Sequence, residues 1–163
     1  MAIKVGDRIP KATLKRLTPE GMKDIHTEEY FKGRKVVLFA VPGAFTPTCS
    51  AKHLPGFVEN ADKLKAKGAD EIACFSVNDA FVMDSWGKDR NVGNKVTMLA
   101  DGNAEFTKAL GLEMDGSGYG MGLRTQRFSA LVEDGVVKKL HVEAPGKFEV
   151  SDAGTMLEDL AAR

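Results

Sequence analysis

The stretch Pro42-Gly43-Ala44-Phe45-Thr46-Pro47-Thr48-Cys49 decides both the fold and the chemistry that this chain predicts. It follows directly on the apolar run Val36–Val41, and it precedes a segment with helical periodicity. The apolar run is short, rich in β-forming residues and hydrophobic on both faces, which is typical of a central strand covered from above and below. This order of strand, loop and helix places Cys49 in the first turn of a helix.

The position of Cys49 favours reactivity. The first turn of a helix offers unpaired backbone N–H groups and the positive end of the helix dipole, and both favour an anion. We therefore expect the Cys49 thiol to ionise more easily than a free thiol, which makes it a candidate nucleophile. A lone cysteine at a helix start, without the surrounding motif, could equally be a small core residue.

The rest of the chain alternates between strand and helix patterns. Further strands are expected over four β-rich segments: Glu71–Val77, Val96–Ala100, Phe128–Glu133 and Val136–His141. The last two are joined by Asp134-Gly135, a dipeptide that tolerates positive φ and so indicates a two-residue hairpin. Such alternation, closed by a hairpin, predicts an α/β fold with a central mixed β-sheet flanked by helices.

Helices are expected between these strands. Apolar residues recur at helical spacing from Leu54 to Leu64, and Gly68 follows as a C-cap. The other helical segments are Phe81–Lys88, Ala104–Leu110 and Asp152–Ala162, the last opened by Ser151 as N-cap.

Pro55 interrupts the first of these helices. It lacks a backbone donor and collides with the carbonyl of Ala51, so the helix should kink or start again there. The turn that carries Cys49 would then be less firmly tied to the rest and could open locally.

Composition limits the function. The 163 residues, 43% of them hydrophobic, show no repeat and no linker, so one domain over residues 1–163 is expected. A net charge of zero gives no case for nucleic acid or an anionic membrane surface. The N-terminus has no signal-type apolar stretch, so a cytoplasmic location is expected. Two cysteines are too few for a disulfide scaffold, and the three histidines do not have the spacing of metal ligands. The glycines at 116–122 lack a P-loop pattern and indicate a flexible loop.

The motif around Cys49 resembles a known family. The segment V-P-G-A-F-T-P-T-C-S-A-K-H-L-P-G-F at Val41–Phe57 is similar to the active-site region of type II peroxiredoxins, the peroxiredoxin-five subgroup. Their pattern P-x-x-x-T-x-x-C is met by Pro42, Thr46 and Cys49. The resemblance continues through F-S-V-N-D-A-F-V-M at Phe75–Met83, A-D-G-N at Ala100–Asn103 and R-T-Q-R-F-S at Arg124–Ser129.

The resemblance implies a thioredoxin-like fold and a thiol peroxidase that reduces hydrogen peroxide and organic hydroperoxides. It makes Cys49 the peroxidatic nucleophile, with Thr46, Pro42 and an arginine from a distant strand as its catalytic partners. Arg127 adjoins the expected strand at Phe128 and fits the family placement, and Arg124 is the competing choice. The resemblance also implies a homodimer.

The chemistry of peroxide reduction requires the same kinds of side chain. When a thiolate attacks one oxygen of an O–O bond, negative charge builds on the departing oxygen, so the site needs hydrogen-bond donors and a cation. Thr46 supplies a hydroxyl, Arg127 a fixed charge, and the helix start around Thr48 supplies backbone amides.

The sulfenic acid left on Cys49 must be reduced by a second thiol. Cys74 is the only internal candidate, but three residues of strand separate it from the sheet edge, roughly 10 Å, whereas a disulfide needs Cα atoms within about 7 Å. We therefore expect Cys74 to be structural and the reductant to be external, with no bound cofactor. Among relatives that resemble this chain, glutathione with glutaredoxin is the leading donor and thioredoxin the second.

Two other functions remain open. A thiol–disulfide oxidoreductase of the thioredoxin type would use C-x-x-C, but Thr46 stands in its first position. A redox-sensing interaction protein would use Cys49 without turnover.

Three aromatic side chains and one histidine also have open roles. His53 lies one turn after Cys49 and could face the sulfur or merely pack. Phe45, Phe81 and Trp86 are either core residues or an apolar rim at a dimer contact.

Overall fold

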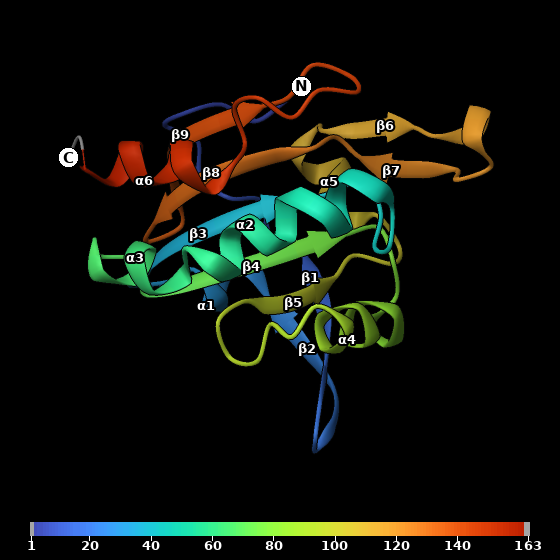
Figure 1. Cartoon of the computed structure of the whole chain (residues 1–163), viewed down its shortest axis with the longest axis horizontal. Helices are drawn as coiled ribbons and strands as arrows, with labels where there is room; N and C mark the ends of the chain where they lie inside the picture. Colours follow the sequence, from blue (N-terminus) through green and yellow to red (C-terminus); the bar gives the residue numbers. More distant parts are fainter. Residues whose placement is uncertain (1, 162–163) are drawn as a thin grey trace.

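The protein is built around one large sheet (Figure 1), and the computed structural model describes residues 2–161. The strands of this sheet are β1 (Thr13–Thr18), β2 (Gly21–His26), β3 (Lys35–Ala40), β4 (Glu71–Ser76), β5 (Thr97–Ala100), β8 (Phe128–Glu133) and β9 (Val136–Val142). Their order is β2-β1-β5-β4-β3-β8-β9. Strands β3, β4 and β5 run parallel, and the other neighbouring pairs are antiparallel, so the sheet is mixed as predicted.

Helices cover both faces of the sheet (Figure 1). They are α1 (Thr27–Tyr30), α2 (Leu54–Glu59), α3 (Ala61–Ala66), α4 (Ala80–Asp89), α5 (Glu105–Leu110) and α6 (Ala153–Ala161), together with a π-helical turn η1 (Cys49–His53) and a 3₁₀ turn η2 (Ser117–Tyr119). No helix within residues 2–161 is long and apolar enough to cross a membrane.

The side chains of β3 alternate between two separate cores. Val37 and Phe39 pack with α2, α3, α4 and α6, whereas Val36 and Leu38 pack with α1 and α5 on the opposite face. Because both faces of β3 are buried, its sequence is apolar at nearly every position, which is the pattern that revealed it. Both Cys49 and Cys74 belong to the first core.

The C-terminal hairpin forms as the sequence predicts. Glu133 pairs with Val136, and Asp134 and Gly135 adopt φ values of 48° and 79°. These positive angles match the right-handed twist of the strands that the turn joins.

The glycine-rich segment at residues 116–122 is a loop, as predicted, and its flexibility stays a prediction. It joins the strands of a second, two-stranded sheet that was not predicted, in which β6 (Glu113–Asp115) pairs antiparallel with β7 (Leu123–Thr125). Gly116 lies close to this partner strand, since a Cβ there would stand 3.0 Å from the Gly122 carbonyl oxygen. At Gly116 the absence of a side chain permits this close backbone approach.

Two predictions about helix starts have different outcomes. The helix restarts at Pro55 as expected, because η1 ends at His53 and α2 begins at Leu54, with Pro55 in its first turn, where the missing N–H costs no helical bond. The prediction that Ser151 is the N-cap of α6 was wrong. The last residue expected in this helix, Ala162, lies outside the described residues. Asp152 caps this helix, since its carboxylate accepts hydrogen bonds from the backbone N–H and the hydroxyl of Thr155.

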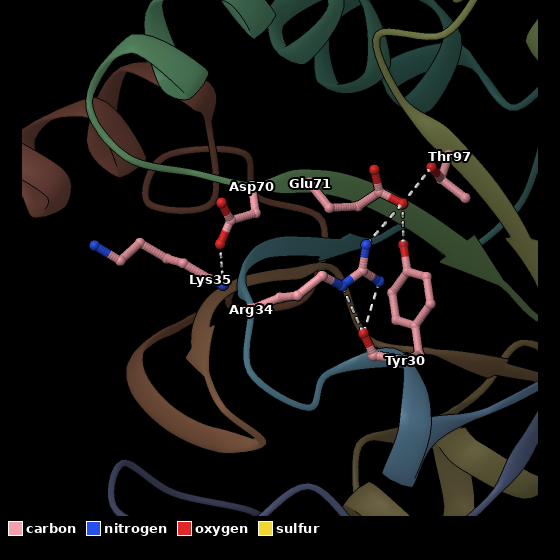
Figure 2. A network of polar contacts seen from close by, with 6 residues as sticks. All are labelled: Tyr30, Arg34, Lys35, Asp70, Glu71 and Thr97. Carbon is pink, nitrogen blue, oxygen red and sulfur yellow. Dashed lines mark hydrogen bonds and ion pairs between the residues drawn. The ribbon is translucent and has the colours of Figure 1, made fainter.

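A polar network fixes the end of the sheet where the parallel strands begin (Figure 2). The carboxylate of Glu71, the first residue of β4, accepts hydrogen bonds from the hydroxyls of Tyr30 and Thr97, both at 2.9 Å, and pairs with Arg34. Burial, followed by the charge of Glu71, raises the pKa of the Tyr30 phenol well above its usual value, so the phenol stays a donor. Cys49 lies beyond the opposite end of β3, away from this network.

Candidate active site

The loop after β3 is held in a tight shape before the helix begins. The backbone N–H of Ala44 donates to Asn78 Oδ1 at 3.0 Å, and the Thr46 hydroxyl donates to the Gly43 carbonyl at 2.7 Å. A side chain at position 43 would be crowded, because a Cβ there would stand 3.1 Å from Thr46 Cγ2 and 3.2 Å from Arg124 Nη1. The loop therefore delivers the helix start in one defined orientation.

Cys49 lies in the first turn of the helical segment, as predicted. This segment opens at Pro47, and the N–H of Ser50 donates to the Thr46 carbonyl at 2.9 Å. The turn that follows is π-helical rather than α-helical, since the N–H of Leu54 donates to the Cys49 carbonyl five residues back. This wider turn lies directly before Pro55, where the helix restarts as α2.

Arg127 contacts the sulfur directly. Its Nη2 lies 3.0 Å from Cys49 Sγ. The β3 and β8 register explains this contact, because Phe128 pairs with Ala40 at the end of β3 and so brings its neighbour Arg127 to the loop that carries Cys49. The contact places a fixed positive charge and an N–H donor at the sulfur.

Arg124 takes a different place. Its Nε donates to the Met121 carbonyl at 2.9 Å and its Nη1 donates to the Val77 carbonyl at 3.2 Å. Arg124 thus ties the β6–β7 hairpin to the end of β4, while Arg127 is the arginine at the sulfur.

Thr46 presents acceptor lone pairs to its surroundings. The hydroxyl proton is already donated to the Gly43 carbonyl. Toward a bound peroxide the oxygen can therefore only accept, which suits the O–H end of a hydroperoxide.

A cavity of about 310 Å³ lies against the residues that cover Cys49. Its walls come from the Cys49 loop, the β6–β7 hairpin, and the segment after β9: Pro42, Thr48, Glu113, Met114, Gln126, Arg127, Glu143, Ala144, Pro145, Gly146 and Lys147. Cys49 itself is fully buried, and Arg127, which lines the cavity, contacts its sulfur at 3.0 Å. The sulfur is therefore shielded from bulk water, yet it lies next to a space large enough for an organic hydroperoxide.

His53 is buried and faces Arg127 rather than the sulfur. Its Nδ1 lies 2.9 Å from Arg127 Nη1, and its Nε2 lies 3.0 Å from the Ser151 carbonyl. Burial, then the positive charge of Arg127, lowers the pKa of the imidazole to about 3, so the ring is neutral at physiological pH.

The aromatic residues of the site divide between core and surface. Trp86 is fully buried, and its Nε1 donates to Ser50 Oγ at 2.9 Å, next to Cys49. Phe45 and Phe81 are 52% and 62% exposed, so the core interpretation was right for Trp86 alone. Phe45 also adopts a left-handed backbone with φ of 65°, which costs free energy in a residue other than glycine.

Cys74 is sealed inside the sheet. It pairs with Phe39 of β3 and has no exposed surface. Burial, and then a negative charge on Cys49, raises the pKa of the Cys74 thiol well above its usual value. Cys74 is therefore a thiol and a poor nucleophile in the folded protein.

Several residues of the site are absent from the predictions made on sequence. Glu143, Lys147 and Ser151 come from a segment after β9 that carries no motif, and Met114 comes from β6, a strand that was not predicted. No group of three metal-ligating side chains occurs among the described residues.

Comparison with known proteins identifies relatives along almost the whole chain. The sequence profile of the Redoxin family matches residues 4–157. The chain is 50% identical to Peroxiredoxin-2E, chloroplastic, of Arabidopsis thaliana, over 98% of this chain and 70% of that protein. It is 47% identical to Peroxiredoxin-2B of the same plant, over 97% and 98% of the two chains. The crystal structure of reduced Prx3 from Vibrio vulnificus in complex with H₂O₂ has a TM-score of 0.94 and 59% identity, covering 97% of this chain and 99% of that one.

Proposed function

Because the chain belongs to the redoxin family and, within it, to the type II peroxiredoxins, we propose that it is a peroxidase recycled by glutathione and glutaredoxin. Peroxiredoxins are thiol peroxidases, and Cys49 is the thiol that we assign to the reaction. One observation carries this assignment: Arg127 Nη2 lies 3.0 Å from Cys49 Sγ, beside a cavity that Pro42 and Thr48 line.

In the first step the Cys49 thiolate attacks one oxygen of the peroxide. A sulfur–oxygen bond forms, the O–O bond breaks, and the departing oxygen takes a proton to leave as water or an alcohol. The sulfur is oxidised to sulfenic acid and the peroxide is reduced. Arg127 stabilises the charge that moves from sulfur to oxygen, while Thr46 accepts the peroxide O–H and holds it in line.

The second step regenerates the thiol. A glutathione thiolate attacks the sulfenic sulfur, a disulfide forms, and the oxygen leaves as water. Glutaredoxin then exchanges this mixed disulfide and passes the electrons of a second glutathione to Cys49. Thioredoxin is the second candidate for this role.

The state of Cys74 supports an external donor. The chain has only two cysteines, and Cys74 is fully buried in β4 with a raised pKa. A disulfide between the two would require Cys74 to leave the sheet, since its backbone is paired on both sides, with β3 and with β5.

The cavity supports a range of peroxides. Its 310 Å³ exceeds the needs of hydrogen peroxide, and Met114, Ala144 and Pro145 give it an apolar side. Alkyl hydroperoxides therefore fit as substrates alongside hydrogen peroxide.

Exposed aromatic rings support a homodimer. Phe45 lies 6.4 Å, ring to ring, from Trp86 of α4, and Phe81 belongs to the same helix. Two large exposed rings near one helix are costly in water, so we propose that a second copy covers them. A cytoplasmic location also stays a proposal, because one relative, Peroxiredoxin-2E, is chloroplastic.

A coupled assay tests the proposed function. NADPH consumption is followed with tert-butyl hydroperoxide, glutathione, glutaredoxin and glutathione reductase, and thioredoxin with its reductase replaces the glutathione system in a parallel reaction. We expect turnover with wild-type protein in the first system. Oxidation of Cys49 without turnover in either system would instead indicate a redox sensor, and reduction of insulin disulfides would indicate a thiol–disulfide oxidoreductase.

A further inference from the structure

The guanidinium of Arg127 makes two contacts through its two terminal nitrogens. Its Nη2 lies 3.0 Å from Cys49 Sγ, and its Nη1 lies 2.9 Å from Nδ1 of His53. The ring of Phe148 lies 5.8 Å from the guanidinium carbon and 4.9 Å from the His53 ring. The contact between His53 Nδ1 and Arg127 Nη1 therefore sets the orientation of the Nη2–H group that reaches the sulfur.

The two partners of His53 fix its tautomer. Arginine has no lone pair to offer, so Nδ1 must be the acceptor in the contact with Arg127. The Ser151 carbonyl can only accept, so Nε2 must carry the proton that it donates at 3.0 Å. His53 is therefore a neutral imidazole with its lone pair aimed at Arg127.

Glu143 fixes the carbonyl on which this tautomer depends. Its carboxylate accepts hydrogen bonds from three successive backbone N–H groups, those of Glu149, Val150 and Ser151, at 2.8–2.9 Å. It also accepts from the Ser151 hydroxyl at 2.7 Å. The N–H of Glu143 donates to the Arg127 carbonyl at 2.9 Å, so the same residue anchors the segment after β9 to the backbone of the arginine.

We propose that His53 is the positioning residue of Arg127, and that the Glu143-anchored segment holds His53 in the tautomer that this role requires. The proposal rests on the proposed peroxidase function. A guanidinium has freedom about its side-chain torsions, and a fixed acceptor at Nη1 removes that freedom before the peroxide arrives. The positioned Nη2–H then stabilises the sulfur anion and the charge of the transition state without first reorganising.

The charges around His53 are consistent with a neutral ring. Arg127 opposes protonation, whereas the carboxylates of Glu143 and Asp152 favour it, and burial outweighs these two. A proton on Nδ1 would point at the Nη1–H of Arg127 and would break the contact. The pKa of about 3 keeps the acceptor intact over the whole working range of pH.

Three variants separate positioning from packing. His53→Phe keeps an aromatic ring between Phe39 and Phe148 and removes both ring nitrogens, and His53→Asn restores an acceptor oxygen close to the place of Nδ1. Phe57→Leu is the matched control for packing, because the Phe57 ring stacks on Phe39 at 4.1 Å and lies 5.6 Å from the His53 ring, whereas its side chain has no polar atom. The readouts are the second-order rate of hydrogen peroxide reduction and the pH profile of Cys49 alkylation by iodoacetamide.

We expect His53→Phe to lower the peroxide rate about tenfold, and to move the alkylation profile toward higher pH, because one charge-assisted contact is lost. His53→Asn should recover the rate to within about threefold of wild type. Phe57→Leu should lose stability and keep both readouts. A folded His53→Phe protein with the wild-type rate and profile overturns the proposal, as does a His53→Asn protein that is equally impaired.

Two further arms complete the test. If His53→Phe does not fold, Glu143→Ala releases the Ser151 carbonyl and leaves His53 in place, so the rate should fall severalfold, and a wild-type rate overturns the proposal. If wild-type protein does not reduce peroxide, the proposed function fails. The alkylation profile still tests His53 in that case, because it reports on the sulfur without any turnover.

Discussion

Replacing Arg127 by glutamine removes the cation beside Cys49 while keeping a polar, uncharged side chain. The lost contact is the one between Nη2 and Sγ at 3.0 Å. His53 loses its partner at the same time, since Nη1 belongs to the same guanidinium. The variant therefore tests the electrostatic core of the site.

The expected size of the effect follows from this distance. Two unit charges 3.0 Å apart attract by about 5.5 kcal/mol at an effective dielectric constant of about 20, which is an upper limit because the charge is partly dispersed in the transition state. Hydrogen bonds to charged groups contribute about 1.5–3 kcal/mol net. The latter range corresponds to a fall in kcat/KM of about ten- to a hundredfold.

The assay is a stopped-flow measurement of peroxide reduction by pre-reduced protein, with the glutathione system omitted so that only the first step is observed. Arg124→Gln is the matched control, because Arg124 donates to the Met121 and Val77 carbonyls, whereas the sulfur is contacted by Arg127. We expect the loss with Arg127→Gln and a change of less than threefold with Arg124→Gln. A folded Arg127→Gln protein with the wild-type rate, or the larger loss with Arg124→Gln, would refute the reasoning.

Three further predictions concern the cysteines, acid stability and local opening. Cys49→Ser should abolish turnover in the coupled assay while Cys74→Ser keeps most of it; an equally inactive, folded Cys74→Ser protein would show that the resolving thiol is internal. Because the pKa of His53 falls from 6.5 to about 3 on folding, the unfolded chain binds a proton first as the pH drops, so stability is full above pH 6.5 and is lost below it. Denaturant unfolding should show wild type losing about 2 kcal/mol more than His53→Phe between pH 7 and pH 5, and equal losses would contradict the assignment. Amide exchange should be faster over Cys49–Leu54 than in β3, since the π turn η1 has no backbone donor at the following proline; equal protection would count against local opening.

The fold could be predicted where local pattern and tertiary environment agree. The strands β3, β8 and β9 are continuous apolar runs or are flanked by a strong turn, so their bounds agree with the prediction to within one residue. Strands β1 and β2 were missed because Leu14 is their only buried side chain, and most of their other positions are polar. The β6–β7 hairpin was missed because its glycines, which permit close backbone approach, indicate a loop when read without a partner.

The residues of the candidate site also differ in how far sequence alone reveals them. Pro42, Thr46 and Cys49 stand within eight residues of one another and form a motif that sequence alone reveals. Arg127 was placed beside them only through a resemblance, since its position follows from the β3–β8 register.

The partnership of His53 with Ser151 could not be predicted from sequence. The two residues are 98 positions apart, and the contact uses a backbone carbonyl, which leaves no trace in residue identity. Glu143 is similar, because its partners are mostly backbone N–H groups and any sequence can supply them.

The most direct test of the central claim is mass spectrometry of the reduced protein after one equivalent of hydrogen peroxide, with and without glutathione. We predict one added oxygen on Cys49 without glutathione, a glutathionyl group on Cys49 with it, and an unmodified Cys74 in both samples. Oxygen on Cys74 or on methionine with Cys49 intact would contradict the peroxidatic role of Cys49. A disulfide between Cys49 and Cys74 would contradict the external reductant.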